Sequence, residues 1–543
     1  MWQKNLPMTS GSRSDDRLLW NDIPIGTTCA YETCIAGRPA IRSWARREED
    51  PAPRLRRIVV WQEVDLGKLN RPGGLVRAVT TIDAEPNLSP RRIAVISAAG
   101  EAVFRFTPGR VIVRFVDGTR NDTQVRSIDF ALLDNAPALI AIYTRVLNIS
   151  NRLPGTFEVY LPGTLTTIPY SLQREGDGLL SSLGELMTFN SAGWLSGVAV
   201  GDSVEIRGMS AVVPRWHSFA RSTRALTKKS ETKQPRFGQD IEIRRNGHRL
   251  YGRLSQPKDP RAFVLIIGGS GLHDRFGQSG AVDLGYSDLT AQLASHGVGS
   301  VLFDKPGAGR TKLTSDMVRP SFAAAIDVAQ SWLDELVRRA PKGVPVIVAG
   351  HSEGGQIAAF LAAHNSDVAG LCLLATACSP IDKILAEQIS LQAQDLSLSE
   401  SARQQRLSEL QSLFEWLRSG DRSAPPSARL APFAHLSEWY GGLIDTQPAT
   451  TLPRVRVPVA ILHGDRDIQV PSQEARALAG LLPQDLASVK IFEGLDHLFK
   501  RSGEASNIRQ YGDRRRKISR DVADWIADWI AKAVLPQGSG QCD

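Results

Sequence analysis

Hydrophobic residues in the C-terminal half of the chain form short continuous runs separated by stretches with helical spacing. The apolar runs lie at 264–267, 300–303, 344–348, 370–374 and 459–462. Continuous runs of this length are typical of strands that are buried on both faces. Between the runs, helical spacing predicts helices at 286–297, 321–339, 355–364 and 472–482. This alternation predicts a doubly wound, mostly parallel α/β sheet with helices on both sides.

Residues 57–217 show a different pattern, in which short β-branched and aromatic runs are separated by turn residues. The runs lie at 57–61, 92–96, 103–106, 111–116, 157–161 and 203–206. Pro108-Gly109 and Asp117-Gly118 are turn signals that predict hairpins between such runs. We therefore expect a β-rich, sandwich-like domain or a partial barrel. A repeat of 40 to 45 residues is absent from the sequence, which argues against a propeller.

The remaining segments predict how the chain is divided. A chain of 543 residues is too long for one ordinary core, so at least two domains are expected. Residues 1–56 have little periodicity and predict an irregular lead-in, and 218–236 have the composition of a linker. The α/β domain then spans 237–535, with a short tail at 536–543. Within it, the polar helical stretch 381–448 predicts a lid over the sheet edge where ligands bind.

Composition narrows the class of protein. Hydrophobic content of 42% and charged content of 22% are those of a folded globular chain. The net charge of +8 comes from residues 1–236, which contain 31 Lys and Arg against 23 Asp and Glu. We interpret this excess as solvated loops and a linker, and no nucleic-acid partner is expected. The sequence shows neither a transmembrane stretch nor a secretory signal, and five cysteines without paired spacing favour a reducing, cytoplasmic location.

The strongest chemical signal is the pentapeptide Gly350-His351-Ser352-Glu353-Gly354. It follows the apolar run 344–349 and precedes a predicted helix, which is the layout of a nucleophile elbow. Flanking glycines allow a sharp turn that lifts the serine hydroxyl clear of the sheet. At a helix N-terminus that hydroxyl would also lie where the helix dipole favours developing negative charge. Ser352 is therefore the candidate nucleophile.

A serine hydroxyl is a weak nucleophile at neutral pH and needs a base, which in turn needs an orienting partner. Two carboxylates, Asp465 and Asp467, follow the apolar run 459–462. His497 lies about thirty residues further on, after another predicted strand. The order serine, aspartate, histidine fits a nucleophile-elbow enzyme. Either aspartate could serve as the acid on this evidence.

Several motifs together resemble the α/β-hydrolase superfamily, in particular its carboxylesterase and acyl-peptidase-like branch. The matching segments are Gly-His-Ser-Glu-Gly-Gly at 350–355, His-Gly-Asp-Arg-Asp-Ile-Gln-Val-Pro at 463–471, Asp-His-Leu-Phe at 496–499 and the loop 303–311. The resemblance covers about 237–535. It implies that Ser352 is the nucleophile, Asp467 the acid and His497 the base, with Asp465 as the competing acid.

The same resemblance implies an oxyanion hole made by backbone amides. Residues 268–275 read Gly-Gly-Ser-Gly-Leu-His-Asp-Arg and are similar to a His-Gly-Ser-Gly-Pro-x-Asp-Arg pattern. Gly268 and Leu272 depart from that pattern. The candidate donors are the N–H groups of Ser270, or alternatively Gly269, together with Glu353. Ordinary packing is the first explanation for His273, and a position that faces the pocket is the alternative.

These features predict a serine hydrolase that cleaves carboxylic esters of small molecules through an acyl-serine intermediate. No metal and no organic cofactor is expected. A thioesterase or acyltransferase, and a peptidase acting on short peptides, are the alternatives within enzymes. A non-enzymatic binding module would leave the serine, aspartate and histidine without a role. The sequence does not specify the acyl group, the oligomeric state or the role of residues 57–217.

Overall fold

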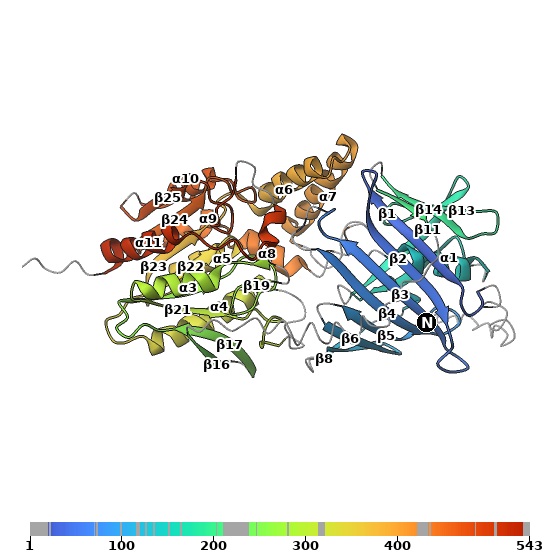
Figure 1. The fold of residues 1–543 in the computed structure, drawn as a ribbon, viewed down its shortest axis with the longest axis horizontal. Helices are drawn as coiled ribbons and strands as arrows, with labels where there is room; N and C mark the ends of the chain where they lie inside the picture. The colour runs from blue at the N-terminus through green and yellow to red at the C-terminus, as the bar shows by residue number, and fades with distance from the viewer. Residues whose placement is uncertain are drawn as a thin grey trace, which may run out of the picture. The chain divides into compact units, whose positions relative to one another are not determined.

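A computed structural model of the chain forms two compact units (Figure 1). It describes most residues from 20 to 535; stretches outside the description include 210–237, 313–320, 421–429 and several shorter ones. The predicted linker 218–236 and tail 536–543 therefore lie outside the described residues. One unit contains the strands up to residue 208, and the other contains the strands and helices from residue 239 onward.

The described residues of the N-terminal unit form one sheet of fifteen strands. Its strands are β1 (Thr28–Ile35), β2 (Arg38–Glu48), β3 (Arg56–Asp65), β4 (Leu75–Ala84), β5 (Pro90–Ser97), β6 (Gly100–Thr107), β7 (Arg110–Phe115), β8 (Arg120–Gln124), β9 (Phe130–Ala131), β10 (Gly155–Leu161), β11 (Thr166–Glu175), β12 (Gly178–Ser181), β13 (Glu185–Phe189), β14 (Leu195–Val200) and β15 (Val204–Gly208). Two meanders, β1 to β8 and β10 to β15, join where β1 pairs with β15. The short β9 ends the second meander and runs parallel to β10.

Helix α1 (Pro137–Ile149) lies against this sheet and contacts β1, β2 and β14. Most of its side chains are apolar and buried, as expected for a helix covered on all sides. Strands from the two meanders also meet, since the rings of Phe106 in β6 and Tyr160 in β10 are 5.3 Å apart. The expectation of a β-rich domain is confirmed. The facing layers, however, come from two halves of one curved sheet and not from two separate sheets.

The expectation of an irregular segment at residues 1–56 is wrong for its second half. Residues 28–48 form β1 and β2, an antiparallel pair at the centre of the sheet. These strands are rich in small and polar residues such as Cys29, Thr33 and Ser43, so the sequence shows no clear alternation. Their structure depends on pairing with the distant β15 and β3. Pairing with distant strands therefore makes these residues strands, although their local sequence pattern is weak.

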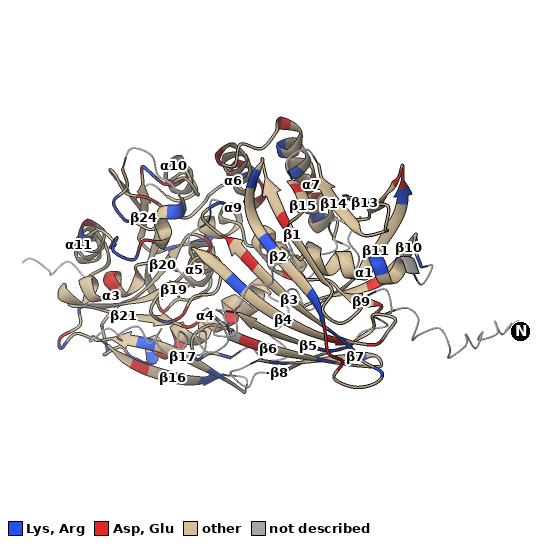
Figure 2. Cartoon of the chain, turned by 45° about the vertical axis from the view of Figure 1, so that its right-hand side comes forward, with Lys and Arg blue, Asp and Glu red and all other residues tan. Residues whose placement is uncertain are grey.

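A row of ion pairs crosses five neighbouring strands of the N-terminal unit. Arg207, Glu32, Arg42, Glu63 and Arg77 lie in β15, β1, β2, β3 and β4, and each pairs with the next at 3.3, 3.1, 3.9 and 2.9 Å. Figure 2 marks basic and acidic positions along the strands of this unit in blue and red. Part of the basic excess in this half is thus paired across the sheet and supports the register of its strands.

The C-terminal unit contains an eight-stranded sheet in the order β16-β17-β21-β18-β22-β23-β24-β25. Its strands are β16 (Gln239–Arg245), β17 (His248–Ser255), β18 (Ala262–Ile267), β21 (Val298–Phe303), β22 (Val346–His351), β23 (Val368–Leu374), β24 (Val459–Gly464) and β25 (Ala487–Phe492). The first two strands are antiparallel to their neighbours and the remaining strands are parallel. The short pair β19 (Gln278–Ser279) and β20 (Val282–Asp283) lies outside this sheet. The predicted doubly wound, mostly parallel sheet is confirmed.

Helices cover both faces of this sheet. Alternate residues of β18 face opposite sides: Leu265 packs in a cluster with helices α4 (Phe322–Arg339), α5 (Glu353–His364) and α10 (Gln473–Ala479). Ile266 packs on the other side with α3 (Tyr286–Ser295) and α11 (Arg520–Trp529), which continues into a π-helical turn (Ile530–Val534). This arrangement leaves the carboxyl ends of the parallel strands free to carry polar loops.

The segment between β23 and β24 forms the predicted helical insertion. It contains α6 (Ile381–Asp395), α7 (Glu400–Arg418), α8 (Ser437–Asp445), α9 (Pro448–Thr451) and a 3₁₀ turn at Leu452–Arg454. Leu413, Phe414 and Leu417 of α7 form a small core with residues of α6 and α8. A further 3₁₀ turn lies at Ile508–Gly512. In the described part of the chain, no helix is long and apolar enough to cross a membrane.

Candidate active site

Ser352 lies at the sharp turn between β22 and α5. Its backbone has φ 53° and ψ −123°, a left-handed conformation that is strained for a residue with a side chain. The Ser352 amide donates to the Leu374 carbonyl at 2.7 Å, which ties the turn to the neighbouring strand. A Cβ at Gly354 would lie 2.3 Å from the Ile267 carbonyl oxygen, so this position has no room for a side chain. The local geometry is that of a nucleophile elbow.

Asp467 and His497 form a buried pair at the same edge of the sheet. His497 Nδ1 lies 2.7 Å from Asp467 Oδ2, and both side chains are at most 5% exposed. His497 and Ser352 line the same cavity. Asp465, in contrast, accepts from the Gly494 amide at 2.7 Å and is about one-third exposed. Of the two aspartates considered from sequence, the structure therefore brings Asp467 to the histidine.

The environment of Asp467 favours its charged form. Burial by itself would raise the pKa of this carboxyl group. The neighbouring His497 and the amides of Gln469 and Val470, which donate at 2.8 and 2.9 Å, outweigh burial and hold the pKa below its ordinary value. An ionised Asp467 accepts from the Nδ1–H of His497, which leaves the Nε2 of that ring available as a base.

The loop that follows β18 packs directly against the elbow. A Cβ at Gly269 would lie 3.1 Å from the Ser352 Cβ, so the two backbones are in close contact. The Gly269 amide donates to the Tyr286 hydroxyl at 3.0 Å and is therefore occupied. Of the two alternatives considered from sequence, this bond favours Ser270 over Gly269 as the candidate donor. The amides of Ser270 and Glu353 have no protein acceptor among the described residues, and both residues line the cavity.

A directional chain of hydrogen bonds joins this loop to His497. The Tyr286 hydroxyl accepts from Gly269 and donates to His351 Nδ1 at 2.8 Å. His351 Nε2 in turn donates to the His497 carbonyl at 2.8 Å. Burial lowers the pKa of His351 to about 3, so the ring is neutral and can both accept and donate. His351 thus connects the loop that follows β18 to His497, in addition to being part of the elbow motif.

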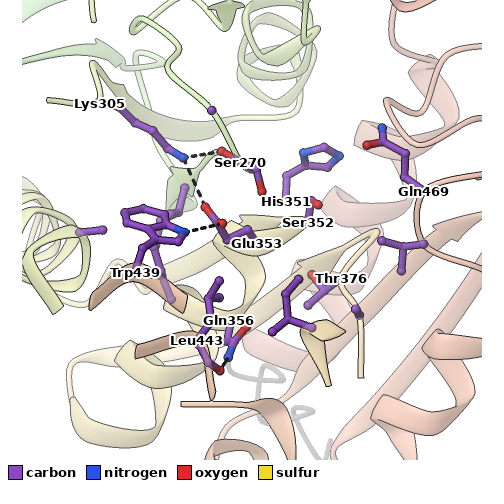
Figure 3. A pocket seen from close by; sticks show the side chains of 18 of the residues that line it. Ser270, Lys305, His351, Ser352, Glu353, Gln356, Thr376, Trp439, Leu443 and Gln469 are labelled. Carbon is purple, nitrogen blue, oxygen red and sulfur yellow. Dashed lines mark hydrogen bonds and ion pairs between the residues drawn. The ribbon is translucent and has the colours of Figure 1, made fainter. Parts of the chain in front are cut away.

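A second polar group lies on the cavity wall beside Ser352 (Figure 3). The Lys305 ammonium, just after β21, donates to the Gly269 carbonyl and lies 3.8 Å from the Glu353 carboxylate. Trp439 of α8 donates its indole N–H to the same carboxylate at 3.0 Å. Burial lowers the pKa of Lys305, and the charge of Glu353 opposes that shift. This group links the helical insertion, the elbow helix and the loop that follows β18.

His273 does not line the cavity, so the alternative of a pocket-facing position does not apply to it. Its ring is 1% exposed and packs edge-on against Tyr286, with centroids 5.6 Å apart. A Cβ at Gly268 would lie 2.1 Å from the His273 Nε2. The His273 imidazole therefore fills the space beside Gly268, the position at which the similar pattern has a histidine. Burial lowers the pKa of His273 to about 3.

The cavity above Ser352 has a volume of about 810 Å³ and a predominantly apolar lining. The insertion contributes much of its wall through Ile381, Ile384, Leu385, Leu436, Trp439, Tyr440 and Leu443. Gln356 of the elbow helix donates to the Leu443 carbonyl at 2.6 Å, which fastens α8 to α5. The described residues contain no cluster of three or more His, Cys, Asp or Glu side chains suited to a metal ion. The cavity can hold a substrate with a sizeable apolar group.

Lys305, Tyr286 and Trp439 were not identified from the sequence. Lys305 had a usable signal, because it directly follows a buried parallel strand, where functional side chains gather. Tyr286 and Trp439 had no such signal in the sequence, since each is a single aromatic residue near the start of a helix. Their positions relative to Ser352 depend on how α3 and α8 pack.

Comparison with known proteins agrees with this geometry. Residues 259–501 match a hydrolase family model described as serine aminopeptidase, S33. The C-terminal unit has the α/β-hydrolase fold. A curated relative, Esterase EstD of Thermotoga maritima, is 24% identical over 319 residues, which cover 57% of this chain and 72% of the relative. The matched residues 259–501 include the elbow, the Asp467 loop and His497.

Solved structures include similar esterases. The ferulic acid complex of Est1E from Butyrivibrio proteoclasticus is 16% identical, with a TM-score of 0.34, and the match covers 54% of this chain and all of that one. An esterase of Pyrococcus furiosus is 14% identical, with a TM-score of 0.36, and covers 60% and 96% of the two chains.

Proposed function

We propose that this α/β-hydrolase cleaves carboxylic esters through an acyl-serine intermediate, with Ser352 as nucleophile, His497 as base and Asp467 as acid. The observation that carries the proposal is the 2.7 Å hydrogen bond between buried His497 and Asp467, beside a cavity that also contains the strained Ser352. This arrangement provides a base of fixed tautomer and a serine held out of the sheet. The relation to an esterase supports the same reaction.

The proposed mechanism follows from these positions. His497 Nε2 takes the hydroxyl proton as Ser352 Oγ attacks the ester carbonyl, and the carbonyl electron pair moves to oxygen. The amides of Ser270 and Glu353 stabilise that oxyanion. Collapse of the tetrahedral intermediate releases the alcohol, which receives the proton from His497. Water then attacks the acyl-serine with His497 again as base, and the carboxylic acid leaves.

The cavity favours an uncharged, apolar acyl group. Its wall is formed largely by aliphatic and aromatic side chains from α4 and from the insertion. Burial of such a group would supply about 25 cal/mol for each Å² removed from water. We therefore expect esters of medium-length or aromatic acids to be better substrates than acetate esters.

An aminopeptidase is the second candidate, because the matching family model is described as one. Recognition of a free amino terminus needs a carboxylate that is available to the substrate ammonium. Among the described cavity residues, Glu353 is the single carboxylate, and Lys305 and Trp439 already engage it. Because Glu353 already has these two partners, the cavity supports an ester substrate better than a peptide with a free amino terminus.

Active-site labelling combined with a substrate panel tests the proposal. A fluorophosphonate probe should label the wild type and fail to label Ser352→Ala. Turnover should then be measured on p-nitrophenyl esters, acyl-CoA thioesters and aminoacyl anilides. We expect the esters to be preferred. An unlabelled wild type would refute a serine hydrolase, and turnover of thioesters or anilides alone would favour the thioesterase or peptidase alternatives.

A further inference from the structure

The Gly269–Ser270 peptide has a cation at one end and a candidate oxyanion donor at the other. Its carbonyl oxygen, from Gly269, accepts from the Lys305 ammonium. Its amide hydrogen belongs to Ser270, which lines the cavity. This peptide is trans, so the carbonyl oxygen and the amide hydrogen point in opposite directions. A contact that holds the Gly269 carbonyl in place therefore also sets the direction of the Ser270 N–H.

Lys305 is itself held in place. Its side chain is 12% exposed and lies 3.8 Å from the Glu353 carboxylate, which is 10% exposed. That carboxylate also accepts from the Trp439 indole at 3.0 Å. In the view of Figure 3, Ser270 lies between Lys305 and Ser352. The ammonium contacts the carbonyl end of this peptide, which is opposite to the Ser270 N–H.

We propose that Lys305 is a positioning residue of the oxyanion site, which orients and polarises the Gly269–Ser270 peptide so that the Ser270 N–H meets the developing oxyanion. A cation at the carbonyl end draws electron density along the amide and strengthens the donor at the other end. Because the donor is fixed before reaction, little reorganisation is needed when negative charge develops. This inference rests on the proposed acyl-serine mechanism.

The test is a series at one position, Lys305→Arg, Lys305→Gln and Lys305→Met, assayed with p-nitrophenyl butyrate. Arginine keeps the charge and a donor, glutamine keeps a donor alone, and methionine keeps neither. Loss of a whole oxyanion donor costs about 10²- to 10³-fold in kcat, so a misaligned donor should cost roughly 10- to 100-fold in Lys305→Met. Arginine should retain the most activity of the three variants, and KM should change by less than about threefold. Lys490→Met, at an exposed lysine of β25, is the matched control and should behave as wild type.

A transition-state analogue separates positioning from a structural role. Butylboronic acid forms a tetrahedral adduct with an active-site serine, and its affinity should fall by the same factor as kcat. Affinity for the product, butyrate, should stay unchanged. A higher KM at unchanged kcat, or a loss of kcat explained by a smaller labelled fraction, would overturn the positioning role alone. A wild type that neither reacts with fluorophosphonate nor turns over the ester would instead overturn the proposed function and this inference with it.

Discussion

The two units of this protein place their polar side chains in different ways. In the N-terminal unit, charged side chains pair along the sheet, as in the row from Arg207 to Arg77 and in the 2.7 Å pair of Arg57 with Asp83. In the C-terminal unit, such groups gather near the carboxyl ends of the parallel strands. All buried histidines among the described residues belong to this unit, namely His273, His351, His463 and His497.

This difference follows from the topology of the two sheets. Antiparallel meanders offer pairs of opposite charge across neighbouring strands, which stabilise register but remain spread over a surface. Parallel strands end at one common edge, so loops that are distant in sequence bring their side chains to one place. Chemistry should therefore depend on the C-terminal unit, while changes in the paired charges of the N-terminal unit should affect stability at most.

The largest expected effect within this comparison is that of Asp467→Asn. Asparagine preserves the shape but favours the wrong tautomer of His497, so kcat should fall by about 10³- to 10⁴-fold. Steady-state assays with p-nitrophenyl butyrate would measure it. Asp465→Asn is the matched control and should stay within about threefold of wild type. A large loss of kcat in Asp465→Asn with near-normal kcat in Asp467→Asn would assign the acid to Asp465.

The second prediction concerns stability in acid. His273 and His351 have pKa values of about 3 when folded, lowered first by burial, against about 6.5 when unfolded. Between these values the unfolded chain binds more protons, so stability should fall as the pH drops below about 6.5. Between pH 7 and pH 5, each of these histidines should lower the free energy of unfolding by about 2 kcal/mol. The lowered pKa of Asp467 contributes nothing in this window, because its stabilisation is lost only below about pH 4.

The midpoint of urea unfolding at pH 7 and at pH 5 would measure this dependence. Loss of fluorophosphonate labelling serves as the readout, because it reports on the C-terminal unit. His273→Phe should reduce the difference between the two pH values, since phenylalanine cannot bind a proton. A pH dependence that is unchanged in this variant would contradict the assignment.

A smaller effect is expected from Tyr286→Phe. Removal of this hydroxyl leaves the Gly269 amide and His351 Nδ1 unpaired, which should lower kcat about tenfold and stability by about 1–3 kcal/mol. Tyr31→Phe is a matched control in the other unit, because the buried Tyr31 hydroxyl donates to the Leu195 carbonyl at 2.5 Å. That variant should lose stability with unchanged kcat. Equal losses of kcat in both variants would show that the relay has no special role.

The smallest effect should come from the charge row of the N-terminal unit. Glu63→Gln removes its pairs with Arg42 and Arg77 and should cost less than about 1 kcal/mol. Thermal unfolding at about 0.05 and 0.5 M salt would measure it, because screening should shrink the difference between variant and wild type. A clear drop in kcat on p-nitrophenyl esters would instead show that this unit contributes to the chemistry.

Sequence predicted the α/β unit well because its signals are local. Continuous apolar runs coincide with β18, β21, β22, β23 and β24, and the expected helices correspond to α3, α4, α5 and α10. The elbow serine, Asp467 and His497 each lie next to such a run, so their common edge could be inferred. Their catalytic roles stay predictions until the variants are assayed.

The remaining features depend on contacts between distant parts of the chain. β1 and β2 are strands because β15 and β3 pair with them, and no local pattern records this. The Gly269 amide already has an acceptor because the Tyr286 hydroxyl, seventeen residues further along the chain, lies beside it. Trp439 reaches Glu353 only because the insertion folds back onto the elbow helix.

The ends of the fifteen-stranded sheet have a consequence for solubility. A sheet of this width would recruit strands from other molecules if long apolar edges were exposed. One end is instead the five-residue β8, with the sequence Arg-Asn-Asp-Thr-Gln, and the other is β9, which has two residues. Neither offers a long apolar template for intermolecular pairing. Lengthening β9 or replacing the polar residues of β8 by valine would therefore favour aggregation while leaving the hydrolase site untouched.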